Sequence, residues 1–199
     1  MIPLVGGPWK SFDEIDFDAL PDRFVLKCTH DSGGLVIVRD KNKMDTATAR
    51  KKITHYLARN YYYCGREWPY KDVPPRINAE KYVEDLGHTN LPVFKVFCFN
   101  GEPKIIQTIQ NDKQPDESID CFDMQWNLLE LRQNFPRSTT HYIRPRMLKK
   151  MLSLAKQLAV GHSFIRIDLY QINGDVMFSE YTFYSDSGMA RFTPEEWGS

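Results

Sequence analysis

The sequence predicts an α+β fold built from antiparallel sheets with flanking helices. Two observations support this class. Apolar, β-branched and aromatic runs follow one another in pairs across short turns, as the strands of hairpins do. Helical periodicity appears in two separate stretches, so that strands and helices are mixed along the chain. The 199 residues suffice for one large domain or two small ones.

The first 84 residues contain patterns for a short helical turn, three strands and one long helix. In chain order, these are the capping box Ser11-Phe12-Asp13-Glu14, strands at 24–28 and 35–38, a helix at about 46–60, and a strand at 77–84. Asp45 is expected to cap the helix, which carries Ile53, Tyr56 and Leu57 on one face. The aromatic, proline-rich stretch 61–75 is expected to form an ordered surface segment.

The remaining residues predict two hairpins and a second helix. Strands are expected at 93–99 and 104–109 around the turn Asn100-Gly101, followed by a polar loop at 110–120. A helix is expected at 145–160, because Leu148, Met151, Leu152, Ala155 and Leu158 recur at helical spacing. Gly161 ends that helix, and a hairpin follows it.

Composition limits the classes of function. Lys plus Arg and Asp plus Glu both number 26, and this balance argues against a general nucleic-acid-binding surface. No stretch has the length and apolarity of a membrane span, and no signal peptide opens the sequence. The four cysteines form no C-x-x-C pair, so neither a zinc site nor a disulfide framework is indicated. We therefore expect reduced cysteines and a cytoplasmic location.

The C-terminal hairpin carries one acid in each strand, Asp168 and Glu180. A two-residue loop, Asn173-Gly174, would place these acids on opposite faces. A three-residue loop, 173–175, pairs Ile172 with Val176 and sets Asp168 across from Glu180, and we favour it for that apolar pair. Facing carboxylates repel unless one is protonated or a cation lies between them, which a divalent metal would do. The alternative is a sheet face with two solvated acids.

Two further stretches have the character of nucleotide-binding elements. In FVLKCTHDSGGLVIV, Lys27 shares a strand face with Val25, and the loop carries Ser32, Gly33 and Gly34. Small residues let backbone N–H groups approach an anion, and a neighbouring Lys supplies charge for phosphate. A plain hairpin with a Gly-Gly turn explains the same residues. In the strand at 77–84, Glu80 could hold an adenine or a ribose, and an amphipathic strand is the alternative.

In chain order, these stretches resemble the ATP-grasp superfamily, and most closely its TupA-like branch, named for a teichuronopeptide biosynthesis protein. The resemblance is carried by FVLKCTHDSGG, YYYCGREWPYKDVPPRINAEKYVED, FKVFCFNGEPKIIQ, CFDMQWNLL, FIRIDLYQINGDVMFSEYTFYSDSG and FTPEEW. These segments cover nearly the whole sequence. The resemblance implies a phosphate-loop part at about 21–84 and a metal-binding part at 85–199, together forming the ATP-grasp region 21–199.

The resemblance also implies residue roles. Arg166 would be catalytic, and Asp168 and Glu180 would hold Mg²⁺. The ATP-binding residues would be Lys27, His30, Ser32, Gly33, Gly34, Glu80, Lys81, Tyr82 and Val83. The substrate contacts would be Lys95, Asp123, Trp126, Ser185, Ser187 and Gly188, although a core position is an alternative for Trp126.

The implied activity is that of an ATP-dependent carboxylate–amine ligase working through an acylphosphate, with ATP and Mg²⁺ required. Family context implies a carboxylate-bearing glycan or amino-acid substrate in bacterial cell-surface polysaccharide biosynthesis (capsule, teichuronopeptide or O-antigen). A sugar phosphotransferase on the same fold, or a truncated non-catalytic nucleotide-binding module, are the alternatives.

The sequence departs from the wider ATP-grasp pattern in two respects. Thr182 stands two residues after Glu180, where many ATP-grasp enzymes have an Asn that binds magnesium. The stretch 1–20 resembles a linker with a short helix that leads out of an N-terminal domain, so we expect that domain to be missing. The end at Trp197-Gly198-Ser199 suggests the loss of a final helix.

Overall fold

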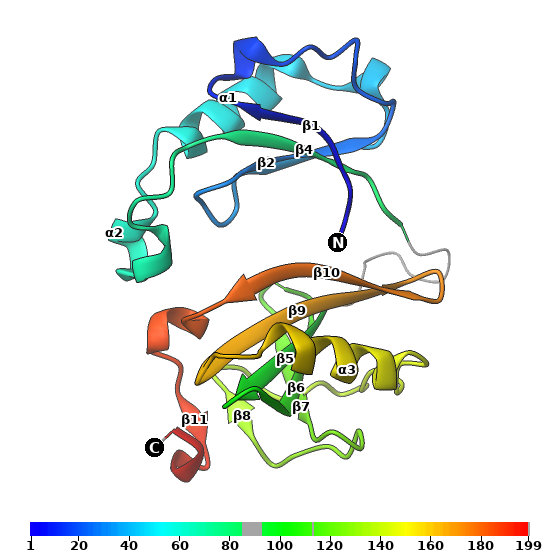
Figure 1. Cartoon of the computed structure of the whole chain (residues 1–199), viewed down its shortest axis with the longest axis vertical. Helices are drawn as coiled ribbons and strands as arrows, with labels where there is room; N and C mark the ends of the chain where they lie inside the picture. Colours follow the sequence, from blue (N-terminus) through cyan, green and yellow to red (C-terminus); the bar gives the residue numbers. More distant parts are fainter. Residues whose placement is uncertain (85–92, 113, 199) are drawn as a thin grey trace. The chain divides into compact units, whose positions relative to one another are not determined.

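The computed structural model describes residues 1–84, 93–112 and 114–198 (Figure 1). The fold is α+β with antiparallel sheets, as the sequence predicts. The chain divides into two compact units, which are described separately. The first comprises residues 2–83, and the second comprises residues 84–199 together with Met1.

The first unit is built on a four-stranded antiparallel sheet in the order β1-β4-β2-β3. Its strands are β1 (Leu4–Trp9), β2 (Phe24–Cys28), β3 (Leu35–Val38) and β4 (Ile77–Lys81). Its helices are η1 (Phe12–Glu14), η2 (Lys41–Lys43), α1 (Thr46–Leu57), α2 (Tyr62–Gly65) and η3 (Trp68–Tyr70). Helix α1 packs on the sheet (Figure 1) through a core that includes Phe24, Leu26 and Ile53.

The local signals of α1 are confirmed, whereas those of η1 are confirmed only in part. The Asp45 carboxylate accepts a hydrogen bond from the Thr48 backbone N–H at 3.0 Å and so caps α1. Ser11 precedes η1 as expected, but its side chain makes no capping hydrogen bond. The Glu14 carboxylate instead accepts from the Lys10 backbone N–H at 2.8 Å.

The second unit contains a five-stranded antiparallel sheet in the order β10-β9-β5-β6-β7. Its strands are β5 (Val93–Phe99), β6 (Glu102–Gln110), β7 (Ser118–Phe122), β9 (Phe164–Ile172) and β10 (Asp175–Thr182). Two short strands, β8 (Arg132–Gln133) and β11 (Phe192–Thr193), pair separately. The helices are α3 (Leu148–Leu158), η4 (Ser185–Gly188) and η5 (Glu195–Gly198).

The start of β7 corrects the expected loop at 110–120. Ser118 and Asp120 lie within the strand, and both are buried. The Asp120 carboxylate lies 2.8 Å from Nδ1 of His141 and accepts from the Ser138 backbone N–H at 3.1 Å. The Ser118 and Ser138 hydroxyls are 3.0 Å apart. The sequence of this strand resembles a loop because its buried polar residues find their partners some 20 residues later in the chain.

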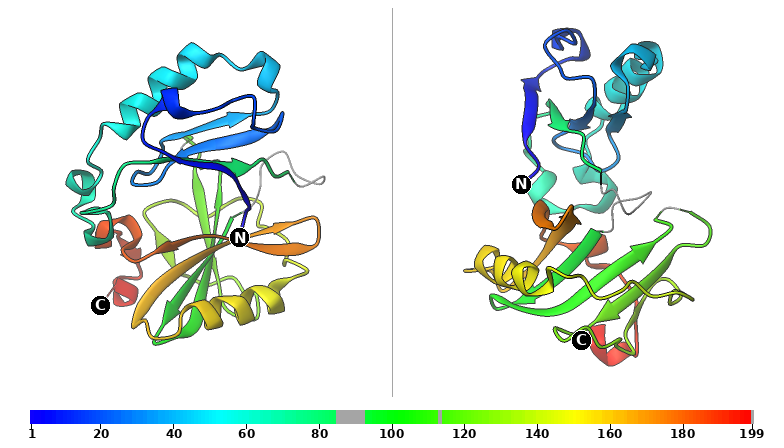
Figure 2. Two further views of the ribbon diagram at one scale, coloured as in Figure 1. Left: turned by 45° about the horizontal axis from the view of Figure 1, so that its top comes forward. Right: turned by 90° about the vertical axis from the view of Figure 1, so that its right-hand side faces the viewer.

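Helix α3 covers one face of this sheet, as both views in Figure 2 show. Leu148, Met151 and Ala155 of α3 are buried against alternate residues of β9, including Ile165 and Ile167. The next residues in the alternation, Arg166 and Asp168, point to the opposite face. Within the described residues, no helix combines the length and apolar character that crossing a bilayer requires.

The four cysteines are free thiols and differ in exposure. Burial raises the pKa of Cys28 and Cys98 to about 11 and that of Cys121 to about 12, whereas Cys64 is exposed. Because the thiolate is the reactive form, a raised pKa leaves these three thiols protonated and unreactive at pH 8. We expect iodoacetamide to modify only Cys64 in the native protein and all four in urea, as read by peptide mass spectrometry. Equal labelling of Cys121 and Cys64 in the native protein would contradict this assignment.

Candidate functional site

The hairpin that carries Asp168 and Glu180 turns through two residues. Ile172 pairs with Asp175 across β9 and β10, so the loop is Asn173-Gly174 and the three-residue loop is wrong. Both loop residues have positive φ, 49° and 81°. Two such residues form the turn whose twist matches antiparallel strands, and Asn-Gly is its preferred sequence. The local turn chemistry therefore prevails over the apolar pair Ile172–Val176.

A β-bulge nevertheless brings the two acids together. Phe178 pairs with Leu169, and the next pair is Glu180 with Asp168, so that Ser179 is the extra residue. One inserted residue changes which side chains face a given side of the sheet. The predicted juxtaposition of Asp168 and Glu180 is present, for a reason different from the one that the sequence suggested.

Arg166 joins the two carboxylates into one cluster. Its Nε donates to Oδ1 of Asp168 at 2.7 Å, and its Nη2 donates to Oδ2 at 2.9 Å, a two-point ion pair. Arg166 Nη2 also lies 3.7 Å from Oε1 of Glu180. Arg166 and Asp168 are 7% and 3% exposed, whereas the Glu180 side chain is 61% exposed. Desolvation by the surrounding protein and the negative charge of Asp168 raise the pKa of Glu180.

Lys95 extends the cluster into the next strand. Glu180, Asp168 and Lys95 form a cross-strand row on β10, β9 and β5. Lys95 is half-buried, and desolvation together with the Arg166 charge lowers its pKa. The row therefore sets two carboxylates and a partly desolvated amine on the sheet face that α3 leaves open.

The turn after β10 contacts this cluster through Ser185. Its hydroxyl accepts a hydrogen bond from Nη1 of Arg166 at 2.9 Å. Ser187 and Gly188, with φ of 56° and 73°, continue the same turn in η4. Ser185 thus contacts Arg166 directly. Ser187 and Gly188 follow Ser185 within the same short helix.

A chain of buried amides lies next to the cluster and was not among the predicted residues. Gln107 is the cross-strand partner of Lys95, and its Nε2 donates to Oε1 of Gln133 at 2.6 Å. Gln133 Nε2 donates in turn to Oδ2 of Asp186 at 2.6 Å. A signal was available for Gln107, which alternates with Ile105 and Ile109 on one face of its strand. Gln133 and Asp186 become neighbours only through the tertiary fold.

The first unit pairs two of the predicted ATP-binding residues directly. Nζ of Lys27 on β2 lies 2.6 Å from Oε2 of Glu80 on β4, with side chains 38% and 22% exposed. Val25 pairs with Glu80 and Lys27 pairs with Asn78, so Lys27 and Glu80 are diagonal neighbours. The expected alternation is confirmed, since Phe24, Leu26 and Cys28 face the core.

Packing against neighbouring residues fixes the conformation of the loop between β2 and β3. His30 is 3% exposed, and its Nε2 lies 3.0 Å from the Arg59 carbonyl oxygen, whereas Ser32 is exposed. Gly33 adopts a φ of 108°, which glycine tolerates best. A Cβ on Gly34 would lie 2.9 Å from Cβ of Tyr56, so helix α1 itself requires glycine there. Packing against α1 thus explains the glycine at position 34 without any bound anion.

Asp31 in this loop was not predicted as a site residue. Its side chain has 0% exposure, and its Oδ2 lies 3.6 Å from Nε of Arg59. Desolvation by burial raises the pKa of Asp31, and the Arg59 charge opposes that shift.

The strand expected at 77–84 ends at Lys81, so Tyr82 and Val83 lie outside β4. Lys81 ends β4, is exposed, and donates its backbone N–H to the Pro3 carbonyl at 2.9 Å. The Tyr82 ring contacts two guanidinium groups, with Arg23 at 5.2 Å and Arg39 at 5.9 Å from its centroid. Val83 is half-buried.

Two predicted substrate residues lie elsewhere in the second unit. Asp123 closes a tight turn, because its carboxylate accepts from the backbone N–H groups of Gln125 and Asn127 at 2.8 and 2.7 Å. Trp126 stacks on Phe122 with ring centroids 4.2 Å apart, and it packs against the core under α3. That core lies on the sheet face opposite Asp168. Of the two possibilities for Trp126, a substrate contact or a core position, the structure supports the core position.

The donor set suits a magnesium ion that arrives with phosphate. Among the residues that the structure describes, no three His, Cys, Asp or Glu side chains converge as a metal cage. Mg²⁺ is commonly held by one or two carboxylates, with phosphate oxygens and water completing its shell. Asp168 and Glu180 provide two carboxylates, and each Asp168 oxygen keeps a lone pair beyond its bond to Arg166. The residues present therefore fit a nucleotide-bound Mg²⁺.

Several solved structures are similar to part of this chain. D-alanine–D-alanine ligase from Bacillus anthracis, complexed with ATP, is 16% identical, with a TM-score of 0.48 over 91% of this chain and 48% of that one. The corresponding ligase from Helicobacter pylori is 13% identical, with a TM-score of 0.44 over 88% and 45%. N5-carboxyaminoimidazole synthase from Aspergillus clavatus is 16% identical, with a TM-score of 0.43 over 83% and 35%.

The chain thus spans about half the length, or less, of these enzymes. No curated protein matches the sequence. The family model described as TupA-like ATPgrasp matches residues 1–199. The chain therefore belongs to the TupA-like ATP-grasp family.

Proposed function

We propose that the protein is an ATP-dependent ligase that joins a carboxylate to an amine. A carboxylate oxygen attacks the γ-phosphorus of ATP, the bond to the β–γ bridging oxygen breaks, and ADP leaves. The amine nitrogen then attacks the acyl carbon of the acylphosphate. Phosphate leaves with its electron pair, and the amine gives its proton to solvent. Family membership and the Arg166–Asp168–Glu180 cluster support this proposal.

The second unit would supply the reacting end of the site. Asp168 and Glu180 would hold Mg²⁺, which neutralises phosphate charge when bound. Arg166 keeps N–H groups beyond those bound to Asp168 and Ser185, so it can donate to a transferring phosphoryl group. Lys95 would add positive charge beside Asp168. Ser185, Ser187 and Gly188 would face the substrate.

The first unit would bind the nucleotide. Lys27 would contact the phosphates by exchanging its ion pair with Glu80 for phosphate oxygens. Glu80 would then be free to accept from the adenine amino group, and Lys81, Tyr82 and Val83 would flank the ring. The loop from His30 to Gly34, including Ser32 and Gly33, would cover the phosphates. The functional division into 21–84 and 85–199, preceded by a linker, belongs to the same proposal.

The substrate proposal is a carboxylate-bearing glycan or amino acid in bacterial cell-surface polysaccharide biosynthesis, with the reaction in the cytoplasm. It is supported by family membership. The chain spans about half the length of the D-alanine–D-alanine ligases to which it is similar, and the complete reaction is part of this proposal.

Glu180 provides the sharpest test of the metal site, since its exposed side chain contributes little to packing. Mg²⁺ and ATP at a hundred times their Kd should stabilise the native protein by about 2.7 kcal/mol. Glu180→Gln should keep the ligand-free melting temperature and lose most of that increment.

The matched control is Glu130→Gln, which removes a carboxylate from an exposed position away from the cluster. It should behave as the wild type in both measurements. An undiminished Mg²⁺–ATP shift in Glu180→Gln would refute the metal role, and ADP release with added acids and amines would extend a positive result to catalysis.

A further inference from the structure

A cavity of about 630 Å³ lies within the second unit, next to the Arg166 cluster. Its floor is the sheet face that α3 leaves open, contributed by Phe97, Ile105 and Cys121. Phe97 is the cross-strand partner of Arg166, so the two side chains share that face. Cavities of this size hold small organic molecules.

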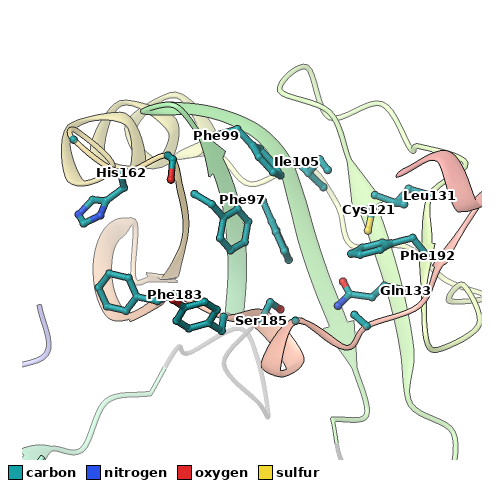
Figure 3. A pocket seen from close by; sticks show the side chains of 16 residues that line it. Phe97, Phe99, Ile105, Cys121, Leu131, Gln133, His162, Phe183, Ser185 and Phe192 are labelled. Atoms are coloured by element: carbon teal, nitrogen blue, oxygen red, sulfur yellow. The ribbon is translucent and has the colours of Figure 1, made fainter. Parts of the chain in front are cut away.

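The lining is mainly apolar and aromatic, and its polar side chains are those of Gln133, His162, Ser163 and Ser185. Six Phe and Tyr rings border the cavity: Phe97, Phe99, Phe164, Phe183, Tyr184 and Phe192. Figure 3 shows the Phe97 ring projecting into the space from the sheet, with Phe183 and Phe192 contributed by the C-terminal segment. Among the described residues that line it, none is Asp, Glu, Lys or Arg. Such walls favour an apolar group and penalise buried hydroxyls that find no partner.

The polar end of the cavity adjoins the reacting cluster. Ser185 belongs to the lining and accepts a hydrogen bond from Nη1 of Arg166 at 2.9 Å. Gln133 also lines the cavity, and its side-chain amide is already paired with Gln107 and Asp186. A molecule whose carboxylate lies at Arg166 can therefore extend its other end over Ser185 into the aromatic part.

We propose that the carboxylate substrate carries a bulky apolar group, aryl or branched alkyl, which fills this cavity. The inference rests on the proposed ligase function and narrows its substrate class. It selects a hydrophobic acid, such as an amino acid with a large apolar side chain, over a uronic acid whose ring is covered with hydroxyls. The aromatic walls supply the binding area, and Arg166 and Ser185 mark the end at which the carboxylate reacts.

The test uses two carboxylates of similar size and opposite character. Saturation-transfer NMR on the full chain, without nucleotide, measures the binding of 3-phenylpropanoate and of glucuronate. We expect the aryl acid to bind roughly tenfold more tightly or better, as burial of an apolar ring in an apolar pocket predicts. Glucuronate binding as tightly as 3-phenylpropanoate, or more tightly, would overturn the inference.

Filling the cavity locates the binding. Ala190 lines it, and Ala190→Trp should weaken 3-phenylpropanoate by roughly tenfold. Ala47→Trp, the same change on the exposed surface of α1, should leave the affinity unchanged. Should Ala190→Trp fail to fold, Ser163→Trp fills the cavity from an exposed lining position. Unchanged affinity in a folded cavity-filling variant would place the aryl acid elsewhere and overturn the inference.

The Mg²⁺–ATP melting shift of the same proteins separates this inference from the proposed function. A normal shift without aryl-acid binding rejects the apolar substrate class alone. Aryl-acid binding that Ala190→Trp removes, without any nucleotide shift, rejects the ligase proposal and leaves the cavity as an apolar acid site.

Discussion

Asp168→Asn should lower the free energy of unfolding by about 3 kcal/mol and also abolish stabilisation by Mg²⁺ and ATP. The first effect arises because Asp168 neutralises Arg166 through two hydrogen bonds, at 2.7 and 2.9 Å, in a site where both side chains are almost completely buried. An asparagine leaves the buried guanidinium without its counter-charge. The second effect arises because the proposed metal loses one of its two carboxylates.

Urea unfolding without ligand and thermal melting with Mg²⁺ and ATP measure the two effects separately. Glu180→Gln provides the comparison, since it removes the other carboxylate while Arg166 retains its main partner. An Asp168→Asn protein that retained the full nucleotide increment would show that Asp168 serves only to pair Arg166.

Ile167→Ala should lower the free energy of unfolding by about 2–5 kcal/mol while leaving the nucleotide increment intact. Ile167 has 0% exposure and packs in the core beneath α3, so truncation removes buried apolar area and leaves a cavity. Its neighbours in sequence, Arg166 and Asp168, point to the opposite face. Substitutions at adjacent positions of one strand should thus have different effects. Ile167→Ala should reduce stability alone, whereas Asp168→Asn should reduce both stability and the response to Mg²⁺ and ATP.

The measurement is urea unfolding followed through the amide signals of β9, with the Mg²⁺–ATP melting shift on the same samples. Ile37→Ala is the matched control, because Ile37 is 46% exposed on β3 and its truncation should change stability by about 0.5 kcal/mol or less. A lost nucleotide increment in Ile167→Ala would mean that the core face and the cluster face are not independent.

The hairpin shows where sequence reasoning succeeded and where it failed. Asn173-Gly174 is a strong local signal for a two-residue turn, and the structure follows it. Regular pairing from that turn would have separated Asp168 from Glu180. The bulge at Ser179 restores their pairing, and bulges have no dependable signature in a single sequence. The correct pair was therefore predicted with an incorrect loop.

Long-range contacts account for the other differences. The polar residues of β7 led to the prediction of a loop where the structure has a buried strand. Their hydrogen-bond partners lie 18 to 21 residues away in the chain, so the sequence around β7 does not reveal them. Trp126 follows Asp123, another predicted substrate contact, by three residues in the sequence, yet it stacks in the core because its turn places it over Phe122.

The sequence by itself determined the α+β class, the limits of β2, β3 and β5, the capped helix α1 and the apolar face of α3. These features depend on periods of two or about 3.6 residues and on local hydrogen bonds, which lie within a few positions of one another. Only the tertiary structure decided that Arg166 pairs with Asp168, that Gln107, Gln133 and Asp186 form one chain, and that an aromatic cavity adjoins Ser185. Arg166 and Asp168 lie two residues apart on β9, whereas the other contacts join strands and loops distant in sequence, and their geometry is set by strand register, the bulge and side-chain packing.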